Sequence, residues 1–417
     1  MKEVIILAGG LGTRLAKTVS DRQKVMAPVG GRPFLAYILK DLANKGFVRC
    51  VLAVSYHSEQ IENCFGNSYE GMTLSYSYEK TPLGTGGAIK KALDNTSSQY
   101  IAVINGDTYF DTDIDSLYQL ILDKKAVIAL AAKEMPDCSR HSTLSISDDG
   151  QILSFSEKKK NEKGYINGGV YVIRRDIFDH ITEERFSFEK DILEKTRNGL
   201  YAEISTGYFI DMGIPEAYFR ANTEIPLLFG ENVFPAVFLD RDGVICEERH
   251  HLYKTEDFRF IDGVPEAIER FREKGYLIYV ITNQAGVAKG LYTEKDVLKL
   301  HEHMLLLLKD ITHIDGIYYC PYHKDAVVPG YKKDSPDRKP GDGMIMNAVR
   351  DAKEKGIIID LKNSILVGDK ISDILAGKKA GIGKNILVRS GHPIDEASEF
   401  PDMITDSLAT IELEEKR

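Results

Sequence analysis

The sequence predicts an α/β protein of two domains. Short apolar runs that end in Gly, Asn or Asp recur along the chain, and a stretch with helical periodicity follows each of them. That alternation is typical of a mostly parallel sheet. The pattern restarts after a segment at 224–235 that contains two prolines and a glycine and shows no period. At 417 residues the chain is long enough for two domains. We therefore expect one domain over residues 1–225 and a second, with different chemistry, over residues 236–417.

Composition narrows the class of protein further. The chain has 54 Lys and Arg residues against 63 Asp and Glu residues, a net charge of −9, which disfavours broad binding to nucleic acid or to an anionic membrane. No stretch approaches the roughly 20 apolar residues needed to cross a bilayer, and the first residues are typical of a strand rather than a signal peptide. The five cysteines are widely spaced and form no C-x-x-C pair, which favours a reducing compartment. We expect a soluble cytoplasmic protein.

In the first domain we predict strands at 4–8, 50–55 and 101–104. The first strand runs into the loop GGLGTR at 9–14, where glycines let backbone N–H groups approach an anion and an arginine closes the loop. The loop lacks the G-x-x-x-x-G-K-[ST] pattern of a P-loop and the third glycine of a dinucleotide-binding fingerprint. Taken alone, these residues predict either a phosphate-binding loop or a tight turn between a strand and a helix.

A second motif decides between those alternatives. Lys24 follows ten residues after Arg14, in the run KVMAP at 24–28. With this pair the sequence resembles the sugar-1-phosphate nucleotidyltransferases, whose signature is a GGxGTRL loop followed by a lysine and a proline. The resemblance continues through LGTGGA at 83–88, NGD at 105–107, EK at 157–158, NGG at 167–169 and FID at 209–211. It implies a Rossmann-like α/β sandwich that joins a nucleoside triphosphate to a sugar 1-phosphate and releases pyrophosphate.

The chemistry of that reaction explains the residues that the resemblance assigns. The sugar phosphate attacks the α-phosphorus in line, so cations must stand where negative charge builds, and Arg14 and Lys24 would supply them. Asp107 and Asp211 match the family's metal pair, since Mg²⁺ prefers a few carboxylates together with phosphate oxygens. The resemblance places the nucleotide against Gly9, Gly10, Gly12, Thr13, Gly84 and Thr85. It places the sugar phosphate against Glu157, Lys158, Asn167 and Gly169.

The identity of the base depends on Glu79, which stands before the LGTGGA loop where several relatives contact the nucleobase. A carboxylate can accept hydrogen bonds from both the N1–H and the amino group of guanine, which favours GTP. The alternative is a solvated surface glutamate. The segments at 165–171, 186–191 and 207–216 look like those of guanylyltransferases that act on D-glycero-D-manno-heptose 1-phosphate.

In the second domain an apolar strand predicted at 236–239 ends in DRDG at 240–243. Residues i and i+2 of a strand point the same way, so Asp240 and Asp242 face one pocket. Further strands at 277–281 and 365–367 should end at the same sheet edge, where open α/β folds place their sites. The DxD, with TN at 282–283, RKP at 338–340 and GDKISD at 368–373, resembles the haloacid dehalogenase-like phosphatases. This resemblance implies a Rossmann-like (Rossmannoid) domain.

By this resemblance Asp240 attacks phosphorus and forms an aspartyl phosphate, while Asp242 protonates the leaving oxygen and later activates water. The stretch between residue 243 and the strand at 277 is too short for a large cap domain, so we expect an open site. Thr282 and Lys339 would hold the phosphoryl oxygens, and Asn283 and Arg338 would contact the substrate. One Mg²⁺ would be bound by Asp240, Asp369 and the backbone carbonyl of Asp242.

A closer pattern, TNQAGVAKG at 282–290 with CPYH at 320–323, looks like that of the D-glycero-D-manno-heptose 1,7-bisphosphate phosphatases and the related histidinol phosphatases. Those relatives usually close the loop with a zinc site. This chain keeps Cys320, but Tyr322 stands where the family has a histidine, and SPD at 335–337 replaces the second cysteine pair. A structural zinc needs four ligands, normally Cys or His, so we expect no structural zinc.

The two resemblances join chemically. They predict a bifunctional, Mg²⁺-dependent enzyme that removes the 7-phosphate of heptose 1,7-bisphosphate and then transfers GMP from GTP to the heptose 1-phosphate, giving GDP-heptose and pyrophosphate. One alternative is a mannose-1-phosphate guanylyltransferase fused to a phosphatase for another sugar phosphate or for histidinol phosphate. Another is that one domain is a non-catalytic sensor or scaffold. The sequence leaves open the anomer and whether the chain forms a homo-oligomer.

Overall fold

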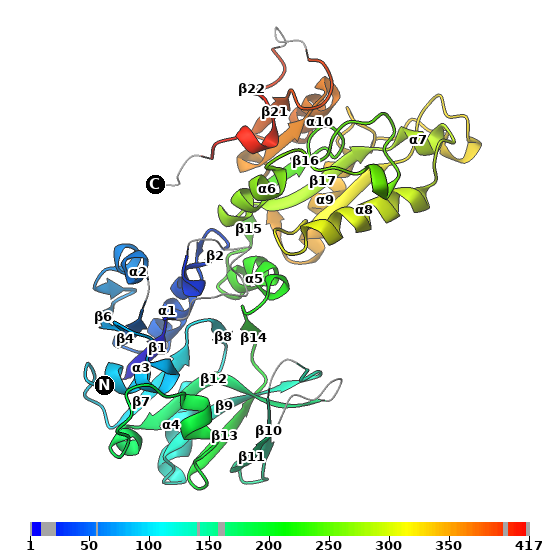
Figure 1. Cartoon of the computed structure of the whole chain (residues 1–417). Coiled ribbons are helices and arrows are strands. Elements are labelled where there is room, and N and C mark those ends of the chain that lie inside the picture. Colours follow the sequence, from blue (N-terminus) through cyan, green and yellow to red (C-terminus); the bar gives the residue numbers. More distant parts are fainter. Residues whose placement is uncertain are drawn as a thin grey trace. The chain divides into compact units, whose positions relative to one another are not determined.

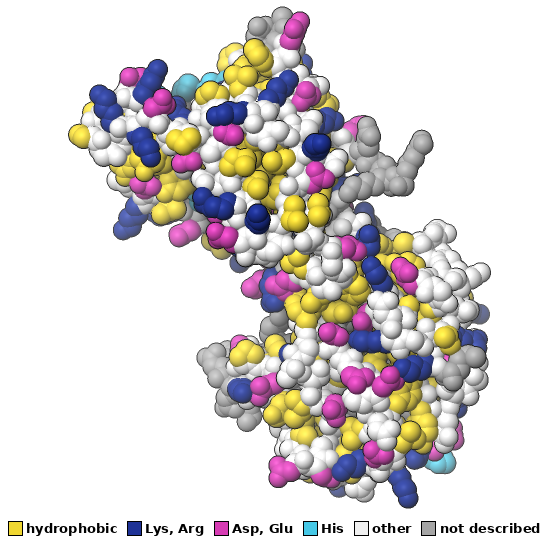
Figure 2. All heavy atoms as spheres, turned by 180° about the vertical axis from the view of Figure 1, so that it is seen from behind, with side chains coloured by type: hydrophobic (Ala, Val, Ile, Leu, Met, Phe, Trp, Pro, Cys, Tyr) yellow, Lys and Arg dark blue, Asp and Glu magenta, His cyan; other side chains and the backbone are white. Residues whose placement is uncertain are grey.

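The computed structural model describes residues 2–9, 22–55, 57–139, 142–156, 163–394 and 399–413 (Figure 1). The chain divides into two compact units, one of Met1–Ala27 and Pro33–Ala217 and the other of Pro28–Arg32 and Tyr218–Arg417. Each unit combines helices with a sheet, which confirms the predicted α/β class. On the face shown in Figure 2, basic and acidic side chains of the described residues are interspersed. Among those residues, no helix is both long enough and apolar enough to cross a bilayer.

The first unit is built on a ten-stranded mixed sheet. Its path is β11-β10-β12-β7-β1-β4-β6-β5, and β9, which pairs with β13, branches from β12. The strands β7, β1, β4 and β6 are parallel, with Ile5 opposite both Val51 and Val103. The bounds are β1 (Glu3–Leu7), β4 (Arg49–Val54), β5 (Ser68–Tyr69), β6 (Met72–Tyr78), β7 (Tyr100–Asn105), β9 (Ile128–Met135), β10 (Thr143–Ile146), β11 (Ile152–Ser156), β12 (Gly164–Arg174) and β13 (Leu200–Ser205).

Apolar side chains of helix α3 and of the short π-helical segment η3 cover one face of this sheet. Ile89 and Phe188 pack there in one cluster with Ile5, Val103 and Tyr171. This packing positions the start of α3 close to the carboxyl ends of the parallel strands. The helices of the unit are α1 (Phe34–Asn44), α2 (Ser58–Phe65), α3 (Gly84–Leu93) and α4 (Ile114–Asp123), with the short turns η1 (Lys24–Met26), η2 (Arg175–Phe178) and η3 (Phe188–Leu193).

The second unit contains a six-stranded parallel sheet with the order β18-β17-β16-β20-β21-β22. Successive strand residues face opposite sides. Val237 and Leu239 therefore pack with α6 and α8, while Ala236 and Phe238 pack with α9 and α10. The strands are β16 (Ala236–Leu239), β17 (Leu277–Asn283), β18 (Gly316–Cys320), β20 (Ile365–Gly368), β21 (Lys384–Val388) and β22 (Met403–Thr405). The helices are α6 (Val264–Glu273), α7 (Ala285–Ala288), α8 (Glu294–Leu308), α9 (Gly343–Glu354) and α10 (Ile371–Ala380).

The connection from β16 to β17, all of which lies among the described residues, contains no large cap, as expected. The helical segments between Gly243 and β17 are the short turn η4 (Thr255–Asp257) and helix α6, which belongs to the apolar core. The three predicted strands β16, β17 and β20 are neighbours in the parallel sheet. Their carboxyl ends therefore meet at one edge, as expected from the motifs.

The segment at 224–235, which shows no period in the sequence, contains regular secondary structure. Helix α5 (Pro215–Leu228) continues through Pro226, and β15 (Val233–Phe234) pairs in parallel with β19 (Ile358–Ile359). Ile225 is fully buried, and Leu227 packs against an apolar cluster of the second unit. Burial of these side chains outweighs the unfavourable effect of proline within a helix.

Candidate active sites

In the first unit, three charged residues from distant parts of the sequence meet near the carboxyl ends of the parallel strands. Lys24 Nζ lies 2.7 Å from Asp107 Oδ2 and 3.5 Å from Asp211 Oδ1. Asp107 follows β7, and the antiparallel pairing of β8 (Thr108–Phe110) with β14 (Phe209–Asp211) sets Asp211 opposite Thr108. The predicted cation and the predicted metal pair therefore lie together.

This donor set fits a divalent cation. The Lys24 side chain is largely buried, whereas both carboxylates are partly exposed. The negative charges of Asp107 and Asp211 converge on one ammonium group, so the position between them attracts positive charge. Two carboxylates that solvent and phosphate can also reach are the protein ligands that Mg²⁺ commonly uses beside a nucleotide.

Glu79 lies beside Gly9 and holds the loop that leads into α3. Its Oε2 accepts a hydrogen bond from the Leu83 N–H at 2.8 Å, and a Cβ added to Gly9 would stand 3.3 Å from its Oε1. Burial raises the pKa of Glu79, although the Leu83 N–H works in the opposite direction. Gly84 has φ +72°, and a Cβ there would stand 2.5 Å from the Phe186 carbonyl oxygen. Only glycine fits this approach between α3 and the segment at 186–191.

Thr85 and Asn167 both hold neighbouring backbone. Thr85 Oγ1 donates to Glu189 Oε2 at 2.7 Å and accepts from the Phe188 N–H at 2.8 Å. Asn167 donates to the Tyr171 hydroxyl and accepts from the Gly169 N–H. Sequence reasoning did not single out Glu189, although it belongs to the segment 186–191 that carries the guanylyltransferase resemblance. Six of the predicted residues lie outside the described residues: Gly10, Gly12, Thr13, Arg14, Glu157 and Lys158.

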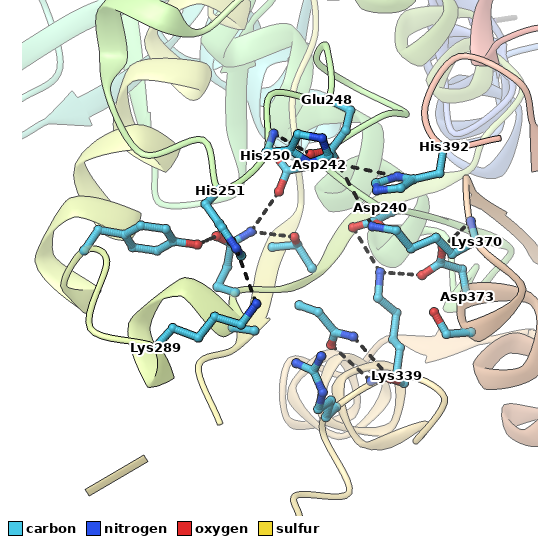
Figure 3. A pocket seen from close by; sticks show the side chains of 17 residues that line it. Asp240, Asp242, Glu248, His250, His251, Lys289, Lys339, Lys370, Asp373 and His392 are labelled. Atoms are coloured by element: carbon cyan, nitrogen blue, oxygen red, sulfur yellow. Dashed lines mark hydrogen bonds and ion pairs between the residues drawn. The ribbon is translucent and has the colours of Figure 1, made fainter. Parts of the chain in front are cut away.

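The second unit places its predicted nucleophile next to a buried ammonium group (Figure 3). Lys339 Nζ lies 3.0 Å from Asp240 Oδ1 and 2.7 Å from Asp373 Oδ1, and it donates to the Ile281 carbonyl oxygen at 2.8 Å. All three charged side chains are buried. Burial raises the pKa of Asp240 above its ordinary value, while the Lys339 ammonium lowers it and the Asp373 carboxylate raises it.

Asp242 has a different electrostatic environment. Arg241, which is fully buried, donates to both of its carboxylate oxygens at 3.0 and 2.9 Å, and Gln284 Nε2 donates to Oδ2 at 3.0 Å. Burial works to raise the pKa of Asp242, but the Arg241 guanidinium and these hydrogen bonds lower it below its ordinary value. The two aspartates of the DxD pair thus have pKa values displaced in opposite directions, which is typical of carboxylates with separate roles.

The carboxylates of Asp240, Asp369 and Asp373 fit a metal ion. Ligand atoms of all three lie within 4.8 Å of one another, and all three residues are buried. Asp369 Oδ2 contacts His392 Nδ1 at 2.7 Å, but its buried Oδ1 has no hydrogen-bond partner among the described residues. A buried carboxylate oxygen without a donor is costly unless a cation binds it. The motif that contains Asp373 was identified from the sequence, but no role was assigned to that residue.

Asp240, Asp242, Lys339 and Asp373 line a cavity of about 390 Å³. Asn283 and Lys339 hold its floor together by exchanging two hydrogen bonds, at 3.2 and 3.1 Å. Thr282 and Arg338 also line the cavity, as predicted. Gln284 is adjacent to a recognised motif and could have been found there. Four further lining residues come from loops with no recognised motif: Glu248, His250, His251 and His392.

Aromatic and hydrogen-bond contacts hold the loop after β18. The rings of Tyr322 and Tyr331 pack at a centroid distance of 6.0 Å, and the Tyr331 hydroxyl donates to Glu294 at 2.8 Å. Cys320 is buried, which raises the pKa of its thiol. His323 Nδ1 accepts from the Asp325 N–H. The expectation of no structural zinc at this loop stays a prediction.

Comparison with known proteins assigns the two halves separately. Residues 3–226 match the family model described as nucleotidyl transferase, and residues 236–385 match that described as polynucleotide kinase 3 phosphatase. The first half is 44% identical to the D-glycero-alpha-D-manno-heptose 1-phosphate guanylyltransferase of Aneurinibacillus thermoaerophilus, over 54% of this chain and 98% of that protein. It is also similar to the crystal structure of HddC from Yersinia pseudotuberculosis complexed with GMP-PN, at 36% identity and a TM-score of 0.50, covering 54% of this chain and 99% of that one.

The second half is similar to two phosphatases of Photorhabdus laumondii. One is a D-glycero-beta-D-manno-heptose-1,7-bisphosphate 7-phosphatase, 42% identical over 42% of this chain and 93% of that protein. The other is a D-glycero-alpha-D-manno-heptose-1,7-bisphosphate 7-phosphatase, 43% identical over 43% of this chain and 96% of that protein. Each half of the chain therefore corresponds to a nearly complete relative.

Proposed function

Because the chain belongs to the nucleotidyl transferase family over residues 3–226 and to the haloacid dehalogenase-like phosphatases over residues 236–385, we propose that it is a bifunctional enzyme of GDP-heptose synthesis. Its second domain, at 236–417, removes the 7-phosphate of D-glycero-D-manno-heptose 1,7-bisphosphate. Its first domain, at 1–225, joins the resulting heptose 1-phosphate to GMP from GTP and releases pyrophosphate. One observation carries this proposal: the named reaction of one relative yields the compound that the named reaction of the other consumes.

The phosphatase reaction begins with attack by an Asp240 oxygen on the phosphorus of the 7-phosphate. The bond from phosphorus to the sugar oxygen breaks, and Asp242 gives that oxygen a proton. Asp242 is ionised in the ligand-free site, and the approach of a phosphate dianion favours its protonated form. Water then cleaves the aspartyl phosphate with Asp242 as the base. Thr282 and Lys339 hold the phosphoryl oxygens. Bound Mg²⁺, held by Asp240, Asp369 and the Asp242 carbonyl, would reduce the repulsion between a dianion and a carboxylate.

In the transferase reaction an oxygen of the sugar 1-phosphate attacks the α-phosphorus of GTP, and the bond to pyrophosphate breaks. Lys24 stands at the convergence of Asp107 and Asp211 and stabilises charge that develops on the phosphates. Mg²⁺ held by the two aspartates would supply further positive charge. Arg14 acts with Lys24, Glu79 selects guanine, and the residues at 157–158 with Asn167 hold the sugar phosphate.

The two reactions act in sequence only on one anomer, because removal of the 7-phosphate leaves the configuration at C1 unchanged. We assign the alpha anomer, which is the one named for the transferase relative and for one phosphatase relative. We also place the enzyme in the cytoplasm, where GTP and sugar phosphates are available. Neither domain requires a nucleic acid or a membrane.

The experiment supplies the purified protein with the alpha or beta anomer of heptose 1,7-bisphosphate, Mg²⁺ and each NTP in turn, and detects NDP-heptose by mass spectrometry. We expect GDP-heptose from the alpha anomer with GTP. Phosphate release without a nucleotide sugar from either anomer would reject heptose 1-phosphate as the substrate of the first domain. The matched control is Asp240→Asn, which should still make GDP-heptose when heptose 1-phosphate is supplied directly.

A further inference from the structure

Helix α8 contributes a buried histidine that neither proposed reaction uses. His301 lies on the buried face of α8, and its Nε2 atom is 3.1 Å from Nη1 of Arg241. Side chains of a strand alternate between its two faces, and Val237 and Leu239 of β16 pack with α6 and α8. The same alternation, continued past the end of the strand, places Arg241 on the α8 side. The guanidinium and the imidazole therefore meet between β16 and α8.

The chemistry of the two groups fixes the direction of this hydrogen bond. A guanidinium has N–H donors and no acceptor, so Nε2 of His301 accepts, and the ring is neutral with its proton on Nδ1. Burial and the Arg241 charge lower the pKa of His301 to about 3, although Asp242 opposes the shift. The imidazole therefore remains an acceptor near pH 7.

The fully buried Arg241 side chain is held at both edges of its guanidinium. Its Nε and Nη2 atoms donate to the two carboxylate oxygens of Asp242 at 3.0 and 2.9 Å, and Nη1 has His301 as its partner among the described residues. Because the guanidinium is planar and rigid, an acceptor at Nη1 sets the plane in which the other edge meets Asp242. Without that acceptor, Nη1 would be a buried donor with no partner, which is costly.

The ring of His301 is itself held in place, away from the substrate. It packs edge-on against the ring of Tyr319 on β18 at a centroid distance of 5.8 Å, and the Tyr319 hydroxyl donates to Glu294 at the start of α8 at 2.7 Å. Neither His301 nor Arg241 is among the described residues that line the cavity. Any effect of His301 on the reaction must therefore pass through Asp242.

We propose that His301 is a positioning residue of the phosphatase: it holds the Arg241 guanidinium against Asp242 and so fixes the direction from which Asp242 gives a proton to the leaving sugar oxygen. The inference rests on the proposed function, in which Asp242 is that acid. His301 and Arg241 keep their own protons throughout. A carboxylate at position 301 would compete with Asp242 for the guanidinium, whereas a neutral acceptor supports the pair without competing.

The test measures phosphate release from the alpha anomer of heptose 1,7-bisphosphate by the full chain. In His301→Leu, kcat should fall by about tenfold to a hundredfold, a part of the roughly 10²–10⁴-fold that general acid–base catalysis contributes. KM should change little, because position 301 does not contact the substrate. His301→Gln, which offers a neutral amide oxygen, should recover most of kcat. In the Asp242→Asn background, His301→Leu should have almost no further effect, because the carboxylate that Arg241 holds is gone.

His303→Leu is the matched control. His303 lies on the same helix, packs against the Phe258 ring and is not among the described residues that line the cavity, so this variant should retain the wild-type kcat. If His301→Leu does not fold, His301→Met takes its place, since the flexible methionine side chain adapts to the same space. Nitrogen NMR of histidine-labelled protein near pH 7 should show the His301 ring neutral with its proton on Nδ1, in a signal that is absent from His301→Gln.

Three results would overturn the inference and leave the proposed function intact. They are an unchanged kcat in His301→Leu, an equal loss in His301→Gln, and a full additional loss when His301→Leu is combined with Asp242→Asn. A proton on Nε2 of His301 would overturn it as well. A wild-type protein that releases no phosphate from the bisphosphate would overturn the proposed function, and the inference with it.

Discussion

Replacement of Lys339 by methionine tests the electrostatics of the phosphatase site. The Lys339 ammonium lies within 3.0 Å of Asp240 and 2.7 Å of Asp373 and donates to the Ile281 carbonyl. Methionine keeps an unbranched side chain that can fill most of the same space. Lys339→Met therefore removes the positive charge and leaves two buried carboxylates without their common partner.

The structure sets the expected size of the effect. Removal of one partner from a buried ion pair costs about 3–5 kcal/mol, a large part of the roughly 5–15 kcal/mol that stabilises a typical domain. The cost arises from the unpaired carboxylates, so it should shrink when one of them is neutralised. Lys339→Met with Asp373→Asn should lose less stability than the sum of the single variants, by about 0.5–3 kcal/mol.

Hydrogen exchange in the full chain, measured by mass spectrometry in the presence of EDTA, gives the free energy of opening at β16 and β20. The chain has no tryptophan, so tryptophan fluorescence is not an alternative. Lys379→Met is the control. Lys379 lies 3.1 Å from Asp342, but its side chain is 60% exposed, and breaking an exposed pair should cost less than about 1 kcal/mol. The reasoning is refuted if Lys339→Met costs no more than the control, or if the single and double variants are additive.

Three further predictions concern the phosphatase site, the transferase site and a buried glutamate of the second unit. Asp240→Asn should abolish phosphate release while pyrophosphate release from GTP and heptose 1-phosphate persists, and surviving phosphate release would reject the covalent mechanism. Asp211→Ala should reduce pyrophosphate release to background without affecting the phosphatase, and unchanged turnover would reject Asp211 as a metal ligand. Glu269 is buried in α6, and burial raises its pKa from 4.5 to about 8, although Arg272 opposes the shift. The protonated form is thus favoured by folding, and the free energy of unfolding should fall between about pH 4.5 and 8, by at most about 1.4 kcal/mol per pH unit. Urea denaturation of Glu269→Gln should show a weaker dependence over that range, and parallel pH curves for variant and wild type would contradict it.

The sequence by itself determined the fold class, the position of each strand that carries a motif and the class of both reactions. Asp240 and Asp242 face one pocket because the side chains of a strand repeat every two residues. The motif residues that follow the other parallel strands were expected beside them, because parallel strands end at one edge of the sheet. Phosphate-monoester hydrolysis and nucleotidyl transfer each depend on a few residue types in a fixed order along the chain. The motifs therefore identify both classes of reaction without knowledge of the contacts between side chains.

Only the tertiary structure decided how those side chains are charged and which loops complete the sites. Asp211 meets Asp107 through the pairing of β14 with β8, and Asp242 is held ionised by the Arg241 guanidinium and by Gln284. Glu248, His250 and His392 line the phosphatase cavity from loops with no recognised motif. Helix α5 continues through Pro226 because its apolar side chains are buried. Local patterns describe residues a few positions apart, whereas contacts between loops and the balance of burial against backbone preference depend on the whole path of the chain.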